Sequence, residues 1–171
     1  MTEVRIRDEA AEDVEAVRRV NDAAFGREGE GRLVDELRRQ GAAVVSLVAE
    51  VDGQVVGHIL FSPVTLEGAS RAEGCLGLAP MAVLPEHQRH GIGGRLIRAG
   101  LDRCREVGAA LVVVLGHPEY YPRFGFVPAP PLGVNCEYPV PDEVFMLQEM
   151  EPGALEGRRG LARYHPAFAA V

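Results

Sequence analysis

The chain has 171 residues, which is enough for one well-packed core and too few for two ordinary ones, so we expect a single domain. With 47% hydrophobic and 25% charged residues it has the composition of a soluble globular protein. The 18 basic residues are outnumbered by 25 acidic ones, and a net charge of −7 would repel a nucleic-acid backbone. No apolar run approaches the roughly 20 residues that a membrane span needs. Neither nucleic acid nor a membrane is therefore expected as a partner.

The residue types exclude several kinds of chemistry. All 18 basic residues are arginines, so a lysine Schiff base and a Walker-type phosphate loop are impossible. Three widely spaced cysteines without a CxxC pair (Cys75, Cys104 and Cys136) indicate neither a disulfide framework nor a thiolate metal site. The first residues lack the apolar stretch of a signal peptide. We therefore expect a cytoplasmic protein.

The first half of the chain predicts a strand, two helices and the start of an antiparallel meander. Apolar residues at three- and four-residue spacing favour the helices, and Asp52-Gly53 between two β-branched runs favours a hairpin. The two helices are expected to share one face of a sheet. The expected elements are strand Val4–Arg7, helix Ala11–Phe25, a helix over Leu33–Leu37 that ends before Gly41, and strands Val44–Val51 and Gln54–Val64.

The second half predicts an α+β fold in which the longest late helix links two neighbouring strands. The expected elements are strand Leu76–Leu84, helix Gly91–Val107, a strand over Ala110–Leu115 buried on both faces, a helical turn over Tyr120–Phe124 and a last strand over Glu143–Met150. Residues 151–171 show no clear period. We expect one domain over residues 1–150, with residues 151–171 as a C-terminal tail packed on it.

The segment between the third meander strand and the late helix has features of a phosphate site. A strand runs into a glycine-containing turn that opens a helix, so free backbone N–H groups and the positive end of a helix dipole meet there. Gly91 and Gly93 leave room for a diphosphate, and Arg89 and Arg95 add positive charge. Taken alone, the two glycines are more typical of an ordinary strand-to-helix turn. Position 96 is leucine, which disfavours a dinucleotide-binding Rossmann motif.

Two motifs together resemble one enzyme family. Gln88-Arg89-His90-Gly91-Ile92-Gly93 resembles the pyrophosphate-binding motif of the GNAT superfamily of acetyl-CoA-dependent N-acetyltransferases, and Tyr120-Tyr121-Pro122-Arg123-Phe124-Gly125-Phe126 resembles that family's Phe-Tyr-x-x-x-Gly-Phe. The resemblance spans residues 3–150. Phe145-Met146-Leu147 and Arg163-Tyr164-His165-Pro166 are similar to the YhbS-like bacterial subgroup.

The resemblance implies a mixed, mostly antiparallel central sheet flanked by helices, with strands four and five splayed to form an acyl-CoA slot. It implies acetyl-CoA as acyl donor and no metal. In the family, strand-four backbone pairs with the pantetheine arm and the glycine turn holds the diphosphate. The residues implied to bind the donor are Met81, Ala82, Val83, Gln88, Arg89, His90, Gly91, Ile92, Gly93, Gly94, Arg95, Tyr121 and Phe124.

The resemblance also implies Tyr121 as the general acid that protonates the departing CoA thiolate. In isolation, Tyr121 is more typical of an ordinary packed aromatic, and it is the motif that favours the catalytic role. Many family members place a glutamate base on strand four, but Gly77–Val83 contains no carboxylate. His117, directly after strand five, is the candidate base because of its pKa range. Glu30 is a second candidate for contact with the substrate, as is Phe25; a water-relayed base or capture of a neutral amine stays open.

Other candidate sites are weaker. His87 and His90 are spaced like metal ligands but lie in the phosphate turn without a third ligand, and Cys136 has no evident base. We expect an N-acetyltransferase that passes the acetyl group directly to an amine of a small molecule or of a peptide or protein, with a homodimer as an allowed assembly. The alternative is a non-catalytic acyl-CoA-binding sensor. Tyr121 favours catalysis, and the missing strand-four carboxylate favours the sensor.

Overall fold

The computed structural model describes residues 3–171, which form two compact units. The first unit contains the residues up to Phe61, Ala79–Gly100 and Pro166–Val171, and the second contains Ser62–Leu78 and Leu101–His165. Strands β3 (Gln54–Glu67) and β4 (Cys75–Val83) and helix α3 (Ile92–Glu106) contribute residues to both. The expected division at residue 150 stays a prediction.

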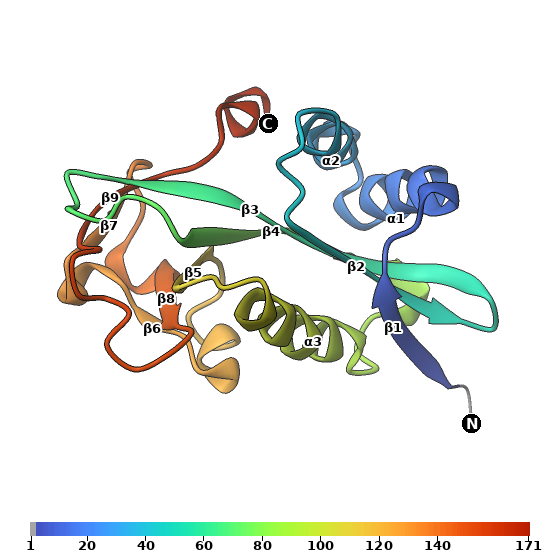
Figure 1. Ribbon diagram of the computed structural model, residues 1–171. Helices are drawn as coiled ribbons and strands as arrows, with labels where there is room; N and C mark the ends of the chain where they lie inside the picture. Colours follow the sequence, from blue (N-terminus) through green and yellow to red (C-terminus); the bar gives the residue numbers. More distant parts are fainter. Residues whose placement is uncertain (1–2) are drawn as a thin grey trace. The chain divides into compact units, whose positions relative to one another are not determined.

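The first unit is a helix–sheet–helix arrangement. Strands β1 (Val4–Asp8), β2 (Val45–Val51) and the first part of β3 pair antiparallel in the order β1-β2-β3. Figure 1 shows α1 (Val14–Phe25) and α2 (Gly29–Arg39) over one face of these strands and the beginning of α3 on the other. Asp52 (φ 52°) and Gly53 (φ 77°) are both left-handed, as a two-residue hairpin turn requires. The predicted hairpin is confirmed.

The packing of this unit explains the arrangement. Val48 and Leu60 lie in one buried cluster with residues of α1 and α2, which confirms that the two helices share a face of the sheet. On the other face Gly57 admits α3: a Cβ at this position would lie 3.1 Å from Leu96 Cδ1 and 3.3 Å from Ile92 Cγ2. A larger residue at position 57 would push the start of α3 away from the strands.

The second unit contains a mixed set of strands. Three residues of β4, Cys75–Gly77, pair in parallel with Leu111–Val113 of β5 (Leu111–Leu115), as expected for two strands joined by a helix. β5 also pairs antiparallel with β8 (Phe145–Glu149), and β8 with β6 (Val127–Pro128). Leu111, Val112 and Val113 are fully buried, as predicted for this strand. The mixed, mostly antiparallel strands with their helices confirm the predicted α+β class.

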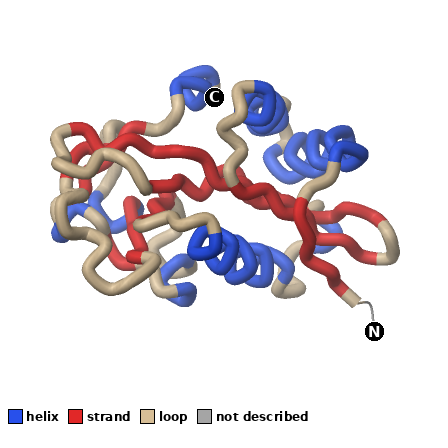
Figure 2. Tube along the Cα trace, in the orientation of Figure 1, coloured by secondary structure: helices blue, strands red, loops and turns tan. Residues whose placement is uncertain are grey.

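Three short strands, β6, β7 and β9, were not predicted. β7 (Val134–Cys136) pairs in parallel with β9 (Gly160–Arg163), and β9 pairs antiparallel with Thr65–Glu67 at the end of β3. β3 is therefore longer than expected, and β9 covers the edge that its extension exposes. β9 lies within residues 151–171, the predicted C-terminal tail, whose sequence shows no clear period. Figure 2 shows these short strands among long loops.

The remaining elements are short 3-10 helices. They are Ala11–Asp13, Pro85–His87, Tyr121–Phe124, Pro130–Leu132, Asp142–Val144 and Pro166–Ala170.

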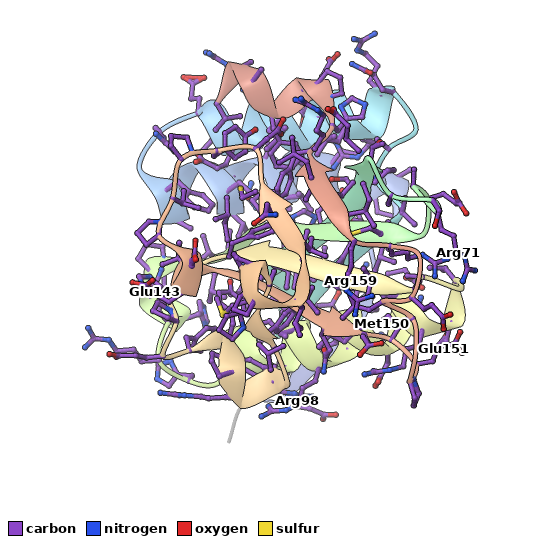
Figure 3. All side chains as sticks on the ribbon, turned by 90° about the vertical axis from the view of Figure 1, so that its left-hand side faces the viewer. Arg71, Arg98, Glu143, Met150, Glu151 and Arg159 are labelled. Carbon is purple, nitrogen blue, oxygen red and sulfur yellow. The ribbon has the colours of Figure 1, made fainter. Side chains whose placement is uncertain are left out.

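In Figure 3, the labelled Glu143 and Met150 mark the two ends of the segment that contains β8. Among residues 3–171, no helix combines the length and the apolar character that crossing a membrane requires.

Candidate functional site

The turn between β4 and α3 is held by its own hydrogen bonds. The Leu84 N–H donates to Val56 O (2.8 Å), and the His87 N–H donates to Leu84 O (2.8 Å). The Gln88 side chain folds back, and its Nε2 donates to Val83 O at 3.0 Å. Because the Gln88 N–H donates to Pro85 O at 3.3 Å, it already has an acceptor in the turn. The predicted diphosphate donors are the N–H groups from Gln88 to Gly94, and that of Gln88 is already bonded within the turn.

The backbone of this turn has the form of an anion site. Arg89 (φ 66°) and Gly91 (φ 80°) are both left-handed, and such residues build the concave nests of N–H groups that bind anions. The first N–H groups of α3, which begins at Ile92, have no partner within the helix and add its positive dipole end. A Cβ at Gly91 would meet no atom within 4 Å, so this side of the turn is open.

Two arginines give the turn an uncompensated positive charge. Arg89 and Arg95 are exposed, and neither has an ion-pair partner among residues 3–171. Arg7 and Arg38, by contrast, are ion-paired: Arg7 bonds Asp13 at 2.6 Å, and Arg38 bonds Glu9 at 2.5 Å. The unpaired guanidinium groups, the helix end and the left-handed turn together favour a phosphate-bearing ligand.

The other residues of this segment that are predicted to bind the donor lie at the end of β4 and at the start of α3, on either side of the turn. Ala82 is buried in the core cluster with α1 and α2, whereas Met81 and Val83 on either side are half-buried. Ile92 is buried and anchors the start of α3, with Gly93 and Gly94 half-buried beside it. His90 is exposed, and its Nδ1 lies 3.3 Å from His87 O. Within the described chain, no group of three or more His, Cys, Asp or Glu is arranged to hold a metal ion.

Tyr121 begins a separate 3-10 turn in the second unit. The carbonyl oxygen of His117 accepts the N–H groups of Tyr120 (3.1 Å) and Tyr121 (3.3 Å). The turn ends at the left-handed Gly125 (φ 97°), whose N–H donates to Pro122 O at 3.1 Å. Glycine suits this position because a Cβ is strained there. The predicted helical turn is confirmed.

The surroundings of Tyr121 keep its phenol protonated. Its side chain is buried, and its ring meets Phe126 and Tyr120 edge-on, with centroids 5.8 and 5.2 Å away. Burial, together with a smaller effect of the neighbouring Tyr120, raises the pKa of Tyr121 to about 12. At neutral pH the group is therefore a proton donor. The half-buried Phe124 packs against Tyr120, with centroids 5.2 Å apart.

The other predicted residues are distributed over both units. In the second unit the side chain of His117 is exposed, in the same turn as Tyr121. In the first unit Glu30 is buried on α2, and its carboxylate accepts both Nε and Nη2 of Arg27, a residue that is itself exposed. Phe25 is 40% exposed at the end of α1.

Two residues that the sequence analysis did not single out contact the Tyr121 turn. Gly116 lies directly against the Tyr121 ring, and Gln148 donates a hydrogen bond to Phe124 O at 3.1 Å. An isolated glycine after a strand and a glutamine in a strand carry no recognisable motif. Their relation to Tyr121 is visible only in the structure.

Comparison with known proteins identifies the family. Residues 11–126 match the model of the acetyltransferase (GNAT) family. The chain is 42% identical over 153 residues to YjhQ of Escherichia coli K12, an uncharacterized N-acetyltransferase, which covers 85% of this chain and 84% of YjhQ.

Two solved structures are similar in both sequence and fold. The Escherichia coli GNAT family N-acetyltransferase YhbS, in complex with CoA, matches with a TM-score of 0.93 and 35% identity, covering 99% of this chain and 93% of that one. A GNAT family acetyltransferase from Brucella melitensis, in complex with acetyl-CoA, matches with a TM-score of 0.81 and 40% identity, covering 97% and 98%. The resemblance predicted from the two motifs is thus confirmed, and the chain belongs to the GNAT family of N-acetyltransferases.

Proposed function

We propose that the protein transfers the acetyl group of acetyl-CoA directly to an amine of a small molecule or of a peptide or protein. The observation that carries this proposal is the open, positively charged turn between β4 and α3, in a chain whose fold matches YhbS in complex with CoA over 99% of its length. No covalent intermediate on the enzyme is required, because binding both substrates together supplies the proximity that the reaction needs.

The donor side of the proposal rests on the strand–turn–helix segment. The N–H groups from Arg89 to Gly94 would hold the diphosphate of the donor, and the unpaired side chains of Arg89 and Arg95 would neutralise its charge. The backbone of Met81–Val83 would pair with the pantetheine amides. A backbone N–H near Val83 would stabilise the negative charge that develops on the thioester oxygen.

Tyr121 is proposed as the general acid. Its phenol is protonated throughout the neutral range, because burial raises its pKa to about 12. A free thiol has a pKa of about 8.5, so complete proton transfer from Tyr121 to a thiolate in water would be uphill. The thiolate forms away from bulk water, where its own pKa rises too, and a hydrogen bond from the phenol stabilises it as the C–S bond breaks.

The acceptor side leaves His117 and Glu30 as candidates. The exposed His117 imidazole has a ring nitrogen that can take a proton from the incoming ammonium, directly or through water. The buried Glu30 carboxylate pairs with the exposed Arg27 and can attract a cationic amine, with Phe25 as an apolar contact.

The experiment is an acceptor screen. The protein is incubated with acetyl-CoA and a library of amino acids, polyamines, aminoglycosides and peptides, and both free CoA and acetylated amine are quantified. The proposal expects CoA release that depends on one class of amine. An acyl-CoA-binding sensor would bind acetyl-CoA without amine-dependent release of CoA.

A further inference from the structure

We propose that Gly116 and Gln148 are positioning residues that fix the hydroxyl of Tyr121 for proton donation. The inference rests on the proposed function, since it assigns the orientation of the general acid to two residues that do not themselves touch the reacting atoms. All the contacts that carry it lie within the second unit.

Gly116 provides the space that the Tyr121 ring occupies. A Cβ at position 116 would lie 2.2 Å from Cε2, 2.8 Å from Cδ2 and 3.2 Å from Cζ of Tyr121. Carbon atoms pack at about 3.5–4.0 Å, so even alanine would displace the ring. The backbone of Gly116 is not left-handed, so its conformation does not itself require glycine. Its N–H donates to Val144 O at 3.0 Å, which ties this position to the residue before β8.

The aromatic side chains around Tyr121 leave its ring little freedom to move. Phe126 and Tyr120 meet it edge-on, at interplanar angles of 86° and 80°. Arg123 lies over the Tyr120 ring, with its Cζ 5.6 Å from the centroid. A ring pushed away from position 116 would therefore have to displace other aromatic side chains.

Gln148 fastens the end of the turn that carries Tyr121. It lies on β8, and its Nε2 donates to Phe124 O at 3.1 Å. The amide packs against Gly125, where a Cβ would lie 2.2 Å from Nε2. Among residues 3–171 its buried Oε1 has no hydrogen-bond partner. An apolar side chain of similar size would avoid that unpaired acceptor, so the specific contribution of glutamine is the bond to Phe124.

These contacts matter for rate because proton donation is sensitive to distance. A general acid must lie within about 2.6–3.2 Å of the atom that it protonates, and a displacement of about 1 Å can cost about a hundredfold in rate. Gly116 sets where the ring lies, and Gln148 sets where the turn ends. Together they define the position of the hydroxyl. Substitutions at these two positions leave the sequence of the turn between β4 and α3 unchanged.

The test is a pair of mutant cycles with Tyr121→Phe. Gly116→Ala displaces the ring, and Gln148→Met keeps the side-chain size but removes the N–H donor. We expect each single variant to lower kcat at least about tenfold with little change in acetyl-CoA Kd, and to lower it no further in the Tyr121→Phe background. If the losses are equal in both backgrounds, or if kcat is unchanged in the single variants, the positioning role is wrong.

An independent readout separates positioning from a failure of the proposed function. With carbon-13-labelled tyrosine, the Tyr121 ring signal, assigned by its loss in Tyr121→Phe, should shift in both Gly116→Ala and Gln148→Met. An unmoved signal contradicts the proposal whatever the activity. If Gly116→Ala does not fold, the Gln148→Met cycle decides the question. A protein that acetylates no amine would overturn the proposed function, and the ring signal would then decide the positioning alone.

Discussion

The imidazole of His58 on β3 and the hydroxyl of Ser46 on β2 are hydrogen-bonded, with Nε2 and Oγ 2.9 Å apart. The Ser46 hydroxyl donates in turn to Glu9 Oε1 at 2.7 Å, so His58 Nε2–H is the donor to Ser46. On the other side, Asn21 Nδ2 lies 3.3 Å from His58 Nδ1. His58 is fully buried, and this burial together with the charge of Arg38 lowers its pKa from 6.5 to about 3. The folded protein therefore holds His58 neutral.

This arrangement predicts that acid weakens the fold well above the range in which carboxylates titrate. Below pH 6.5 His58 is protonated in the unfolded chain but stays neutral in the folded protein. The stability present above that pH is therefore lost as the pH falls toward about 3. At about pH 5 the loss is ~2 kcal/mol. The measurement is the free energy of urea unfolding at about pH 7.5 and about pH 5.

The control for this prediction is His58→Gln, which keeps an N–H donor but has no titrating group. The difference between the two pH values should largely disappear in this variant. Asp13, whose pKa is lowered mainly by its hydrogen bond from Arg7, loses its contribution only at lower pH, in both proteins. An equal loss at about pH 5 in wild type and variant would show that His58 is not the cause.

Gly91→Leu should weaken acetyl-CoA binding at least about tenfold, equivalent to ~1.4 kcal/mol, because its side chain would project beside the backbone proposed to bind the diphosphate. Gly108→Leu is the matched control: Gly108 (φ 84°) is also left-handed, and a Cβ there would meet nothing within 4 Å, but it lies in the loop after α3. Both variants carry similar backbone strain. Calorimetry should give wild-type affinity for Gly108→Leu only, and equal affinities in the two would exclude the turn as the donor site.

Tyr121→Phe should keep the fold and the donor affinity but lower the turnover number. The phenylalanine ring can keep the edge contact with Phe126, whereas the leaving thiolate loses its proton donor. General-acid catalysis is typically worth about 10²–10⁴-fold, and a thiolate is a good leaving group, so we expect roughly a hundredfold loss. Turnover at saturating acetyl-CoA is measured beside the dissociation constant. Wild-type turnover would make Tyr121 a packing residue, and a large loss of affinity would assign its hydroxyl to binding.

His117→Gln tests the proposed base. If the imidazole removes the amine proton, activity falls on the acidic side with one apparent pKa, and that limb should vanish in the variant. Glu30→Gln serves as the comparison, because loss of an ammonium contact should raise KM for the amine without removing the acid limb. An unaltered pH profile in His117→Gln would leave ionisation of the substrate or another residue as the cause.

The local elements of the fold were predictable because their signals are local. The hairpin at Asp52-Gly53, the helix after the glycine turn and the buried run Leu111–Leu115 each carry a signal within a few residues. β9 could not be predicted in this way, because its four residues form a strand only by pairing with β3 and β7. The helix expected from Ala11 begins only at Val14. Residues 11–13 form a 3-10 turn instead, in which Asp13 Oδ2 accepts the Ala10 N–H at 2.7 Å.

The candidate site likewise has features that local sequence motifs predict and features that they do not. The turn around Gly91 and the turn around Tyr121 are continuous segments, so motif spacing predicts them. The contacts of Gly116 and Gln148 join residues that are separated along the chain and carry no pattern of their own. The structure also adds what the sequence could not give for Gln88: its side chain is bonded to Val83 O.

The measurement that tests the central claim most directly is the amount of acetylated amine formed for each CoA released, by mass spectrometry and thiol assay on the same reaction. We predict equal amounts of the two products with at least one class of amine, and a rate that falls roughly a hundredfold in Tyr121→Phe. Tight binding of acetyl-CoA without an acetylated amine from any acceptor class would contradict the claim and identify the protein as an acyl-CoA binder.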